Sequence, residues 1–151
     1  MWASDDPQVS AIDVLEGRLT SAEGERILPY DDATGLPVTA PKGKLSWGRG
    51  FNLMSCGSSG LFQVMERYLL NQLSTILAGY AWYSGANEVR QSVFLEIAYN
   101  AGVSGLLHFP RMLAAAASGD WETAARECKV QEPALASRYA SLGQLLLKGV
   151  A

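Results

Sequence analysis

SGLFQVMERYLLNQLSTILA, residues 59–78, carries the most regular helical pattern in the chain. Its apolar side chains return every three or four positions, which is the spacing of one face of an α-helix. The stripe consists of Leu61, Met65, Tyr68, Leu69, Gln72, Leu73, Ile76 and Leu77. This pattern predicts one helix over about 59–78, long enough to connect two lobes of a small protein.

Upstream of this helix, two patterns follow each other. Asp6 and Pro7 are typical of an N-cap and a first helical turn, and the apolar spacing after them predicts a helix to about Glu25. From Leu28 to Leu53 the sequence instead alternates breakers with single apolar residues, which predicts short strands joined by turns. The breakers are Pro29, Gly35, Pro37, Pro41, Gly43, Gly48 and Gly50.

Downstream of residue 78, the pattern is helical throughout. Asn87 is a good N-cap for the next helix, Gly119-Asp120 a break and cap, and Gly149 a helix end. Between them the sequence predicts helices over Phe109–Ala117, Trp121–Cys128 and Pro133–Lys148. We therefore expect an α+β fold of lysozyme-like architecture in a single domain over residues 1–151. Its parts are a strand-rich N-terminal lobe (about 1–58), a connecting helix (about 59–78) and an all-helical C-terminal lobe (about 79–151).

Composition and charge restrict the class of protein. The 151 residues are 48% hydrophobic and 18% charged, which is typical of one globular domain. A net charge of -3 argues against nucleic acid as a partner. No run of 18 apolar residues occurs, so membrane insertion is not expected. The polar start, Met1 to Val9, lacks the basic and apolar regions of a signal peptide, so we expect the protein to stay in the cytoplasm where it is made.

The chain contains one histidine, His108, and two cysteines, Cys56 and Cys128. A zinc site needs at least two imidazoles or a cluster of thiolates, so we expect no metal and no other cofactor. A Cys–His peptidase is the remaining option for these residues, but no nucleophile motif surrounds either cysteine. Two ordinary thiols and a structural histidine are therefore the favoured interpretation, and whether the two cysteines pair stays open.

Glu23 and Asp32 are the candidate pair for cleaving a glycosidic bond. That reaction needs one protonated acid to assist the leaving oxygen and one carboxylate to direct a water or attack the sugar. Glu23 falls at the end of the first predicted helix and Asp32 in the strand-and-turn segment, so the two can enter one cleft from different elements. If the surrounding residues are ignored, the better interpretation is that Glu23 is a solvent-exposed residue at a helix end and Asp32 an acidic residue in a turn.

The residues around this pair carry a resemblance to a known family. Glu23-Gly24-Glu25-Arg26 leads through Tyr30 to Asp32, and Ser46-Trp47-Gly48-Arg49-Gly50 follows. Two later segments add to it, Ala98-Tyr99-Asn100-Ala101-Gly102-Val103 and Gly119-Asp120-Trp121-Glu122. Together these motifs resemble the phage-type lysozymes, glycoside hydrolase family 24, over about residues 23–128.

The resemblance implies a role for each matching residue. Glu23 would be the general acid, kept protonated by partial burial, and Asp32 the carboxylate that orients or deprotonates water. Ser46 stands at the family's threonine position and would hold that water, and Arg138 stands near the place of an arginine that pairs with the acid. The chain departs from the family in having serine in place of threonine and a longer interval between Asp32 and Ser46. Thr39, which lies within this interval, is a less favoured alternative to Ser46 as the residue that holds the water.

Trp47, Asn100 and Arg138 are the residues expected to bind substrate. Trp47 offers a flat apolar ring on which a sugar can stack, although packing is the commoner role of such a ring. Asn100 reaches a sugar from the C-terminal lobe or makes a structural hydrogen bond, and the sequence leaves both roles open.

The expected function is thus a muramidase that cleaves the β-1,4 bond between N-acetylmuramic acid and N-acetylglucosamine in bacterial peptidoglycan. One alternative is a virion- or tail-associated module that binds cell wall with little turnover, in contact with phage virion proteins. Another is a lytic transglycosylase, against which Asp32 argues. A free endolysin is expected to be a monomer that waits in the host cytoplasm until it reaches the cell wall.

Overall fold

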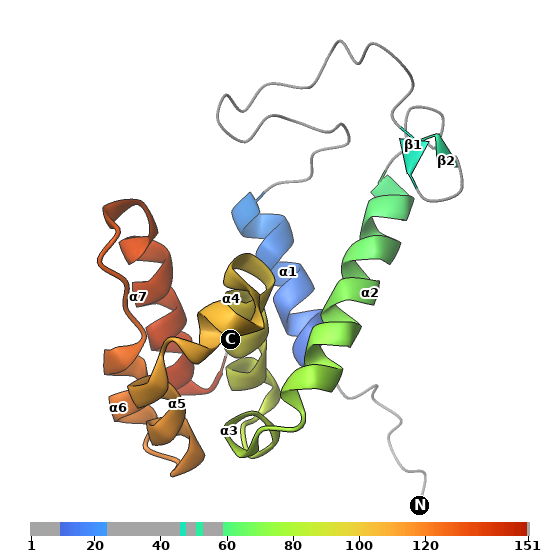
Figure 1. The fold of residues 1–151 in the computed structure, drawn as a ribbon. Helices are drawn as coiled ribbons and strands as arrows, with labels where there is room; N and C mark the ends of the chain where they lie inside the picture. Colours follow the sequence, from blue (N-terminus) through green and yellow to red (C-terminus); the bar gives the residue numbers. More distant parts are fainter. Residues whose placement is uncertain (1–9, 24–45, 48–50, 53–58, 151) are drawn as a thin grey trace, which may run out of the picture.

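The computed structural model describes residues 10–23, 46–47, 51–52 and 59–150, and the side chains of residues 10–19 and 65–150. Within them the helices are α1 (Ala11–Glu23), α2 (Ser59–Leu77), α3 (Ala81–Ser84), α4 (Glu88–Leu107), α5 (Pro110–Ala117), α6 (Trp121–Glu127) and α7 (Pro133–Lys148). Two short strands, β1 (Ser46–Trp47) and β2 (Phe51–Asn52), lie between α1 and α2 in the sequence. Figure 1 shows their arrangement.

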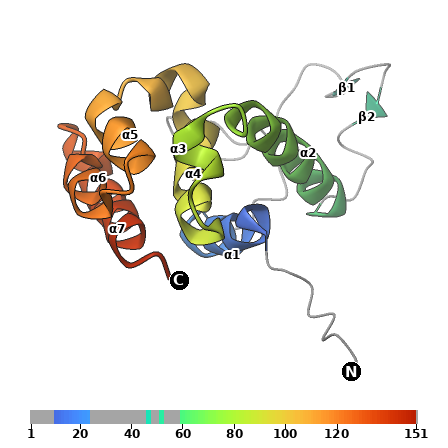
Figure 2. The ribbon, with the colours of Figure 1, turned by 90° about the horizontal axis from the view of Figure 1, so that it is seen from below.

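Helix α4 is the centre of the structure. It packs against α1, α2, α3 and α7. Seen from below, α1 and α2 lie on one side of it and α5, α6 and α7 on the other (Figure 2). Residues 92–98 of this helix are buried without interruption, and Val93, Phe94 and Leu95 have no exposed surface. A helix that is covered on most sides is expected to be apolar all round, and the two polar exceptions in this run, Ser92 and Glu96, therefore need an explanation.

The helix ends follow the local sequence signals. The side chain of Asn87 accepts a hydrogen bond from the backbone N–H of Arg90, and that of Asp120 from the N–H of Thr123, which confirms both predicted N-caps. Pro133 lies in the first turn of α7, and Gly149 ends it with φ +65°, as predicted. At the start of α1, the Ser10 N–H donates to the Asp13 carboxylate, and the Asp13 N–H donates back to the Ser10 hydroxyl. The predicted cap at Asp6-Pro7 lies outside the described residues.

The expected α+β fold with a strand-rich N-terminal lobe is wrong. Helices form nearly all of the described backbone, and β1 and β2 contribute only two residues each. In this antiparallel ladder Ser46 pairs with Asn52, and Trp47 with Phe51. So short a ladder builds no core of its own. Instead α1, which the sequence assigned to the N-terminal lobe, packs on α4 and shares the core of the later helices.

Helix α2 occupies the stretch for which the sequence predicted a helix over about 59–78. Only part of its apolar stripe is buried. Leu73 and Leu77 of the stripe belong to the core, whereas Tyr68 and Ile76 are 67% and 53% exposed; Leu70, which the stripe does not include, is fully buried. The division of the chain into two lobes joined by this helix stays a prediction.

Candidate active site

The predicted catalytic residues fall at the ends of described elements or beyond them. Glu23 is the last residue of α1, and Ser46 and Trp47 form β1. The side chains of these three residues, and the whole of Asp32, lie outside the described part of the chain. The catalytic roles of Glu23, Asp32 and Ser46 and the sugar contact of Trp47 therefore stay predictions, and the described site consists of the residues that hold α1 in place.

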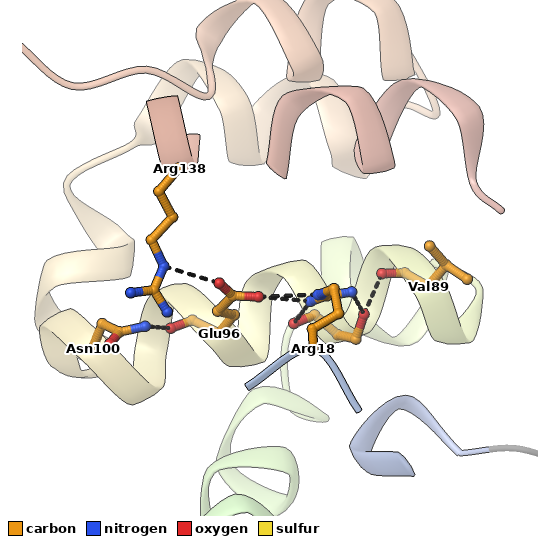
Figure 3. A network of polar contacts seen from close by, with 6 residues as sticks. Arg18, Val89, Glu96, Asn100 and Arg138 are labelled. Atoms are coloured by element: carbon orange, nitrogen blue, oxygen red, sulfur yellow. Dashed lines mark hydrogen bonds and ion pairs between the residues drawn. The ribbon is translucent and has the colours of Figure 1, made fainter. Parts of the chain in front are cut away.

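Arg18 fastens α1 to the middle of α4 through four hydrogen bonds (Figure 3). Its Nε and Nη2 donate to Glu96 Oε2 over 3.1 and 2.9 Å. Its Nη1 donates to the Ser92 hydroxyl over 2.7 Å, and Nη2 also donates to the Ser92 carbonyl over 3.0 Å. The Ser92 hydroxyl in turn donates to the Val89 carbonyl over 2.6 Å, which fixes its orientation toward Arg18. The planar guanidinium is thus held at several atoms at once, the geometry to which arginine is suited.

Glu96 connects this anchor to a third helix. The other oxygen of its carboxylate, Oε1, accepts a hydrogen bond from Arg138 Nε of α7 over 3.0 Å. The Glu96 side chain is only 5% exposed, whereas those of Arg18 and Arg138 are 23% and 28% exposed. A carboxylate this deeply buried is tolerated because cations and hydrogen bonds replace its water. Residues from three separate parts of the sequence therefore meet at one buried acid, and we call Arg18, Ser92, Glu96 and Arg138 the α1–α4–α7 network.

The network meets α1 at Arg18, five residues before Glu23, the residue at which α1 ends. In Figure 1, α1 and the first part of α4 run in the same direction, and α4 is kinked at Gly102. Asn100, one turn after Glu96, is exposed, and its Nδ2 donates to the Glu96 carbonyl over 2.8 Å. Figure 3 shows Asn100 and Arg138 on the same side of Glu96, away from Val89. Asn100 therefore makes a structural hydrogen bond, whereas its contact with a sugar stays a prediction.

The described residues do not support cysteine chemistry. Cys128 is 2% exposed, and burial, with a smaller effect from the Glu96 charge, raises the pKa of its thiol to about 12. Because a thiolate is the reactive form, a thiol that stays protonated at neutral pH is a poor nucleophile. His108 caps the end of α4, where its Nδ1 lies 2.8 Å from the Ser104 carbonyl. Cys128 forms no disulfide in the described part of the chain, and Cys56 lies outside it.

The described residues form neither a metal site nor a membrane-spanning helix. No three His, Cys, Asp or Glu side chains of residues 10–19 and 65–150 gather as ligands of a metal ion. None of the described helices combines the length and the apolar character that crossing a membrane requires.

Sequence reasoning missed Arg18, Ser92 and Glu96. The segment Glu16-Gly17-Arg18 resembles the catalytic motif but lacks a following Tyr-x-Asp, so it attracted no functional assignment. A signal was nevertheless present, because Arg18 stands beside Leu19 on an apolar helical face and Glu96 interrupts an apolar run. A charged residue at a core position is rare unless it is paired. The sequence does not reveal that these two charges are each other's partners.

No protein-family model, no curated protein and no solved structure matches this chain. The assignment of a function therefore depends on the residues themselves.

Proposed function

We propose that this chain is a muramidase that hydrolyses the β-1,4 bond between N-acetylmuramic acid and N-acetylglucosamine in peptidoglycan. The observation that carries the proposal is the motif from Glu23-Gly24 through Tyr30 to Asp32, followed by Ser46-Trp47-Gly48. It supplies an acid, a second carboxylate and a hydroxyl in the order of the phage-type lysozymes. The described residues lend support of another kind, because the helix that ends at Glu23 is tied to the core by a buried ionic network.

In the proposed reaction, Glu23 donates its proton to the glycosidic oxygen as the bond from that oxygen to the anomeric carbon breaks. Asp32 accepts a proton from a water molecule that attacks the same carbon from the opposite face, and the Ser46 hydroxyl orients this water. The products are a free hydroxyl on one sugar and an inverted reducing end on the other. The two carboxyl groups then exchange their protons with solvent to complete the cycle.

The proposal predicts that Glu23→Gln destroys activity without unfolding the protein. The measurement is the loss of turbidity of purified peptidoglycan, with the released fragments identified by mass spectrometry. General acid catalysis contributes roughly 100- to 10,000-fold, so we expect the rate to fall by that factor. Glu122→Gln is the matched control, because it removes an equivalent carboxylate from the exposed first turn of α6.

Three other outcomes would each be decisive. Equal clearing by the Glu23→Gln variant and the wild type would remove Glu23 from the mechanism. Fragments with anhydro ends in place of reducing ends would identify a lytic transglycosylase. Peptidoglycan that the wild type binds in a pelleting assay but does not cleave would identify a binding module.

A further inference from the structure

We propose that Arg18 is a positioning residue for Glu23, acting through the rotation and axial position of α1 on α4. This inference rests on the proposed function, since it assigns a catalytic consequence to a contact that lies away from the reacting atoms. Arg18 precedes Glu23 by five residues on the same helix, which is about 7.5 Å along the helix axis. A fixed point so near the end of α1 controls where its last residue lies.

The other contacts described for the side chains of α1 provide this control less well. Its apolar side chains in the core, such as Leu15 and Leu19, contribute attraction that has no preferred direction. Arg67 of α2 also binds α1, through Asp13 and Glu16, but both acids lie farther from Glu23 than Arg18 does, and Arg67 is 46% exposed. Exposed ion pairs restrict geometry weakly. Among the described contacts of α1, the bonds of Arg18 to Ser92 and Glu96 are thus the directional ones nearest to Glu23.

The anchor is rigid at its far end as well. Glu96 is held from the opposite side by Arg138, and the Ser92 hydroxyl is held by the Val89 carbonyl. Arg18 therefore docks onto acceptors that cannot follow it if α1 turns. With a helix radius of roughly 5–6 Å including side chains, a rotation of about 20° moves a side chain at the surface of α1 by about 2 Å. A displacement of about 1 Å at a catalytic group is enough to lower a rate on the order of 100-fold.

The experiment compares Arg18→Met with Arg67→Met, because each variant removes one arginine that binds α1. For each we would measure kcat and KM on soluble peptidoglycan fragments, and amide hydrogen exchange along α1. We expect Arg18→Met to lower kcat by about 10- to 100-fold with KM changed less than about threefold, and to speed exchange in the last turn of α1. Arg67→Met is expected to leave kcat unchanged and to speed exchange only in the first half of the helix.

Two milder variants keep the test decisive if Arg18→Met fails to fold. Arg18→Lys retains a charge for Glu96 but loses the fork that reaches Ser92, so we expect a partial recovery of kcat. Ser92→Ala removes only the hydroxyl acceptor and should lower kcat less than Arg18→Met. A full kcat in both mild variants, or equal losses in Arg18→Met and Arg67→Met, would overturn the inference while leaving the muramidase proposal standing. A wild type that releases no fragments would overturn both.

Discussion

Replacing Glu96 by glutamine removes the one acid on which the α1–α4–α7 network converges. Glutamine has almost the same shape as glutamate but no charge. Its amide N–H groups donate hydrogen bonds, as do the guanidinium N–H groups of Arg18 and Arg138 that face them. The carboxylate accepts two hydrogen bonds from Arg18 at one oxygen and one from Arg138 at the other. In the variant, at least one guanidinium therefore faces an N–H group in a site that is 5% exposed.

The size of the loss follows from the burial of the partners. Removing one member of a fully buried ion pair costs about 3–5 kcal/mol, because the charge left behind has lost its compensation. The arginine side chains here keep some contact with water, since they are 23% and 28% exposed. That contact relieves part of the penalty, so we expect Glu96→Gln to lower the free energy of unfolding by about 2–4 kcal/mol.

Urea unfolding followed by circular dichroism measures this difference, and an unchanged slope with denaturant would show that the denatured state is not affected. Arg18→Met should cost less in the Glu96→Gln background than in the wild type, because the cation then no longer has its carboxylate partner. A loss below about 1 kcal/mol for Glu96→Gln would refute our account of the network, since that is the range of a surface ion pair. Strict additivity of the two substitutions would refute it as well.

Two further predictions concern other parts of the molecule. Gly143→Ala should lower the free energy of unfolding by about 1–2 kcal/mol in the same urea assay, because a Cβ there would lie 2.8 Å from the Ala125 carbonyl oxygen. Gly17→Ala should raise the free energy of unfolding, because a Cβ there meets nothing within 4 Å. A Gly143→Ala variant more stable than Gly17→Ala would contradict both expectations. The Ser10 hydrogen bonds lower the pKa of Asp13 from 3.8 to about 2, so its contribution to stability is full above about pH 4 and is lost as the pH falls through about 2. The stability gap between the wild type and Asp13→Asn should therefore close between pH 5 and about pH 2, and a constant gap would show that Asp13 does not carry this pH dependence.

Features that depend on neighbouring residues were predictable from the sequence, whereas features that depend on distant residues were not. The caps at Asn87 and Asp120 and the end of α7 at Gly149 were predictable because each depends on one side chain or one backbone angle within a few residues. The strands were not, because a pattern of breakers and apolar residues says where a ladder is allowed and not how long it becomes. In the described chain it extends over only Ser46–Trp47 and Phe51–Asn52.

The ionic contacts of the candidate site were also not predictable, because they join residues far apart in the sequence. Periodicity placed Leu15 and Leu19 on a buried helical face, and both are buried. It did not show that Arg18, on the same face, pairs with Glu96, because a pairing across 78 residues has no local signature. Arg138 was singled out through its family position, and its described ion-pair partner is Glu96. The roles of Glu23, Asp32 and Ser46 stay predictions.

A buried ionic network needs a reason other than stability. Apolar side chains of similar volume often stabilise a core as well as a buried ion pair does, or better, because charges lose their hydration when they are buried. Replacing Glu96 and its two arginines together by apolar residues of similar volume is therefore expected to cost little stability. Directional bonds add a restriction on the rotation of one helix on another to the one that apolar packing supplies, since the attraction between apolar surfaces itself has no direction. A need for fixed rotation is greatest where a helix ends in a residue that must meet a substrate within a fraction of an ångström. The helix that Arg18 fixes ends at Glu23, the residue for which the muramidase proposal makes this demand.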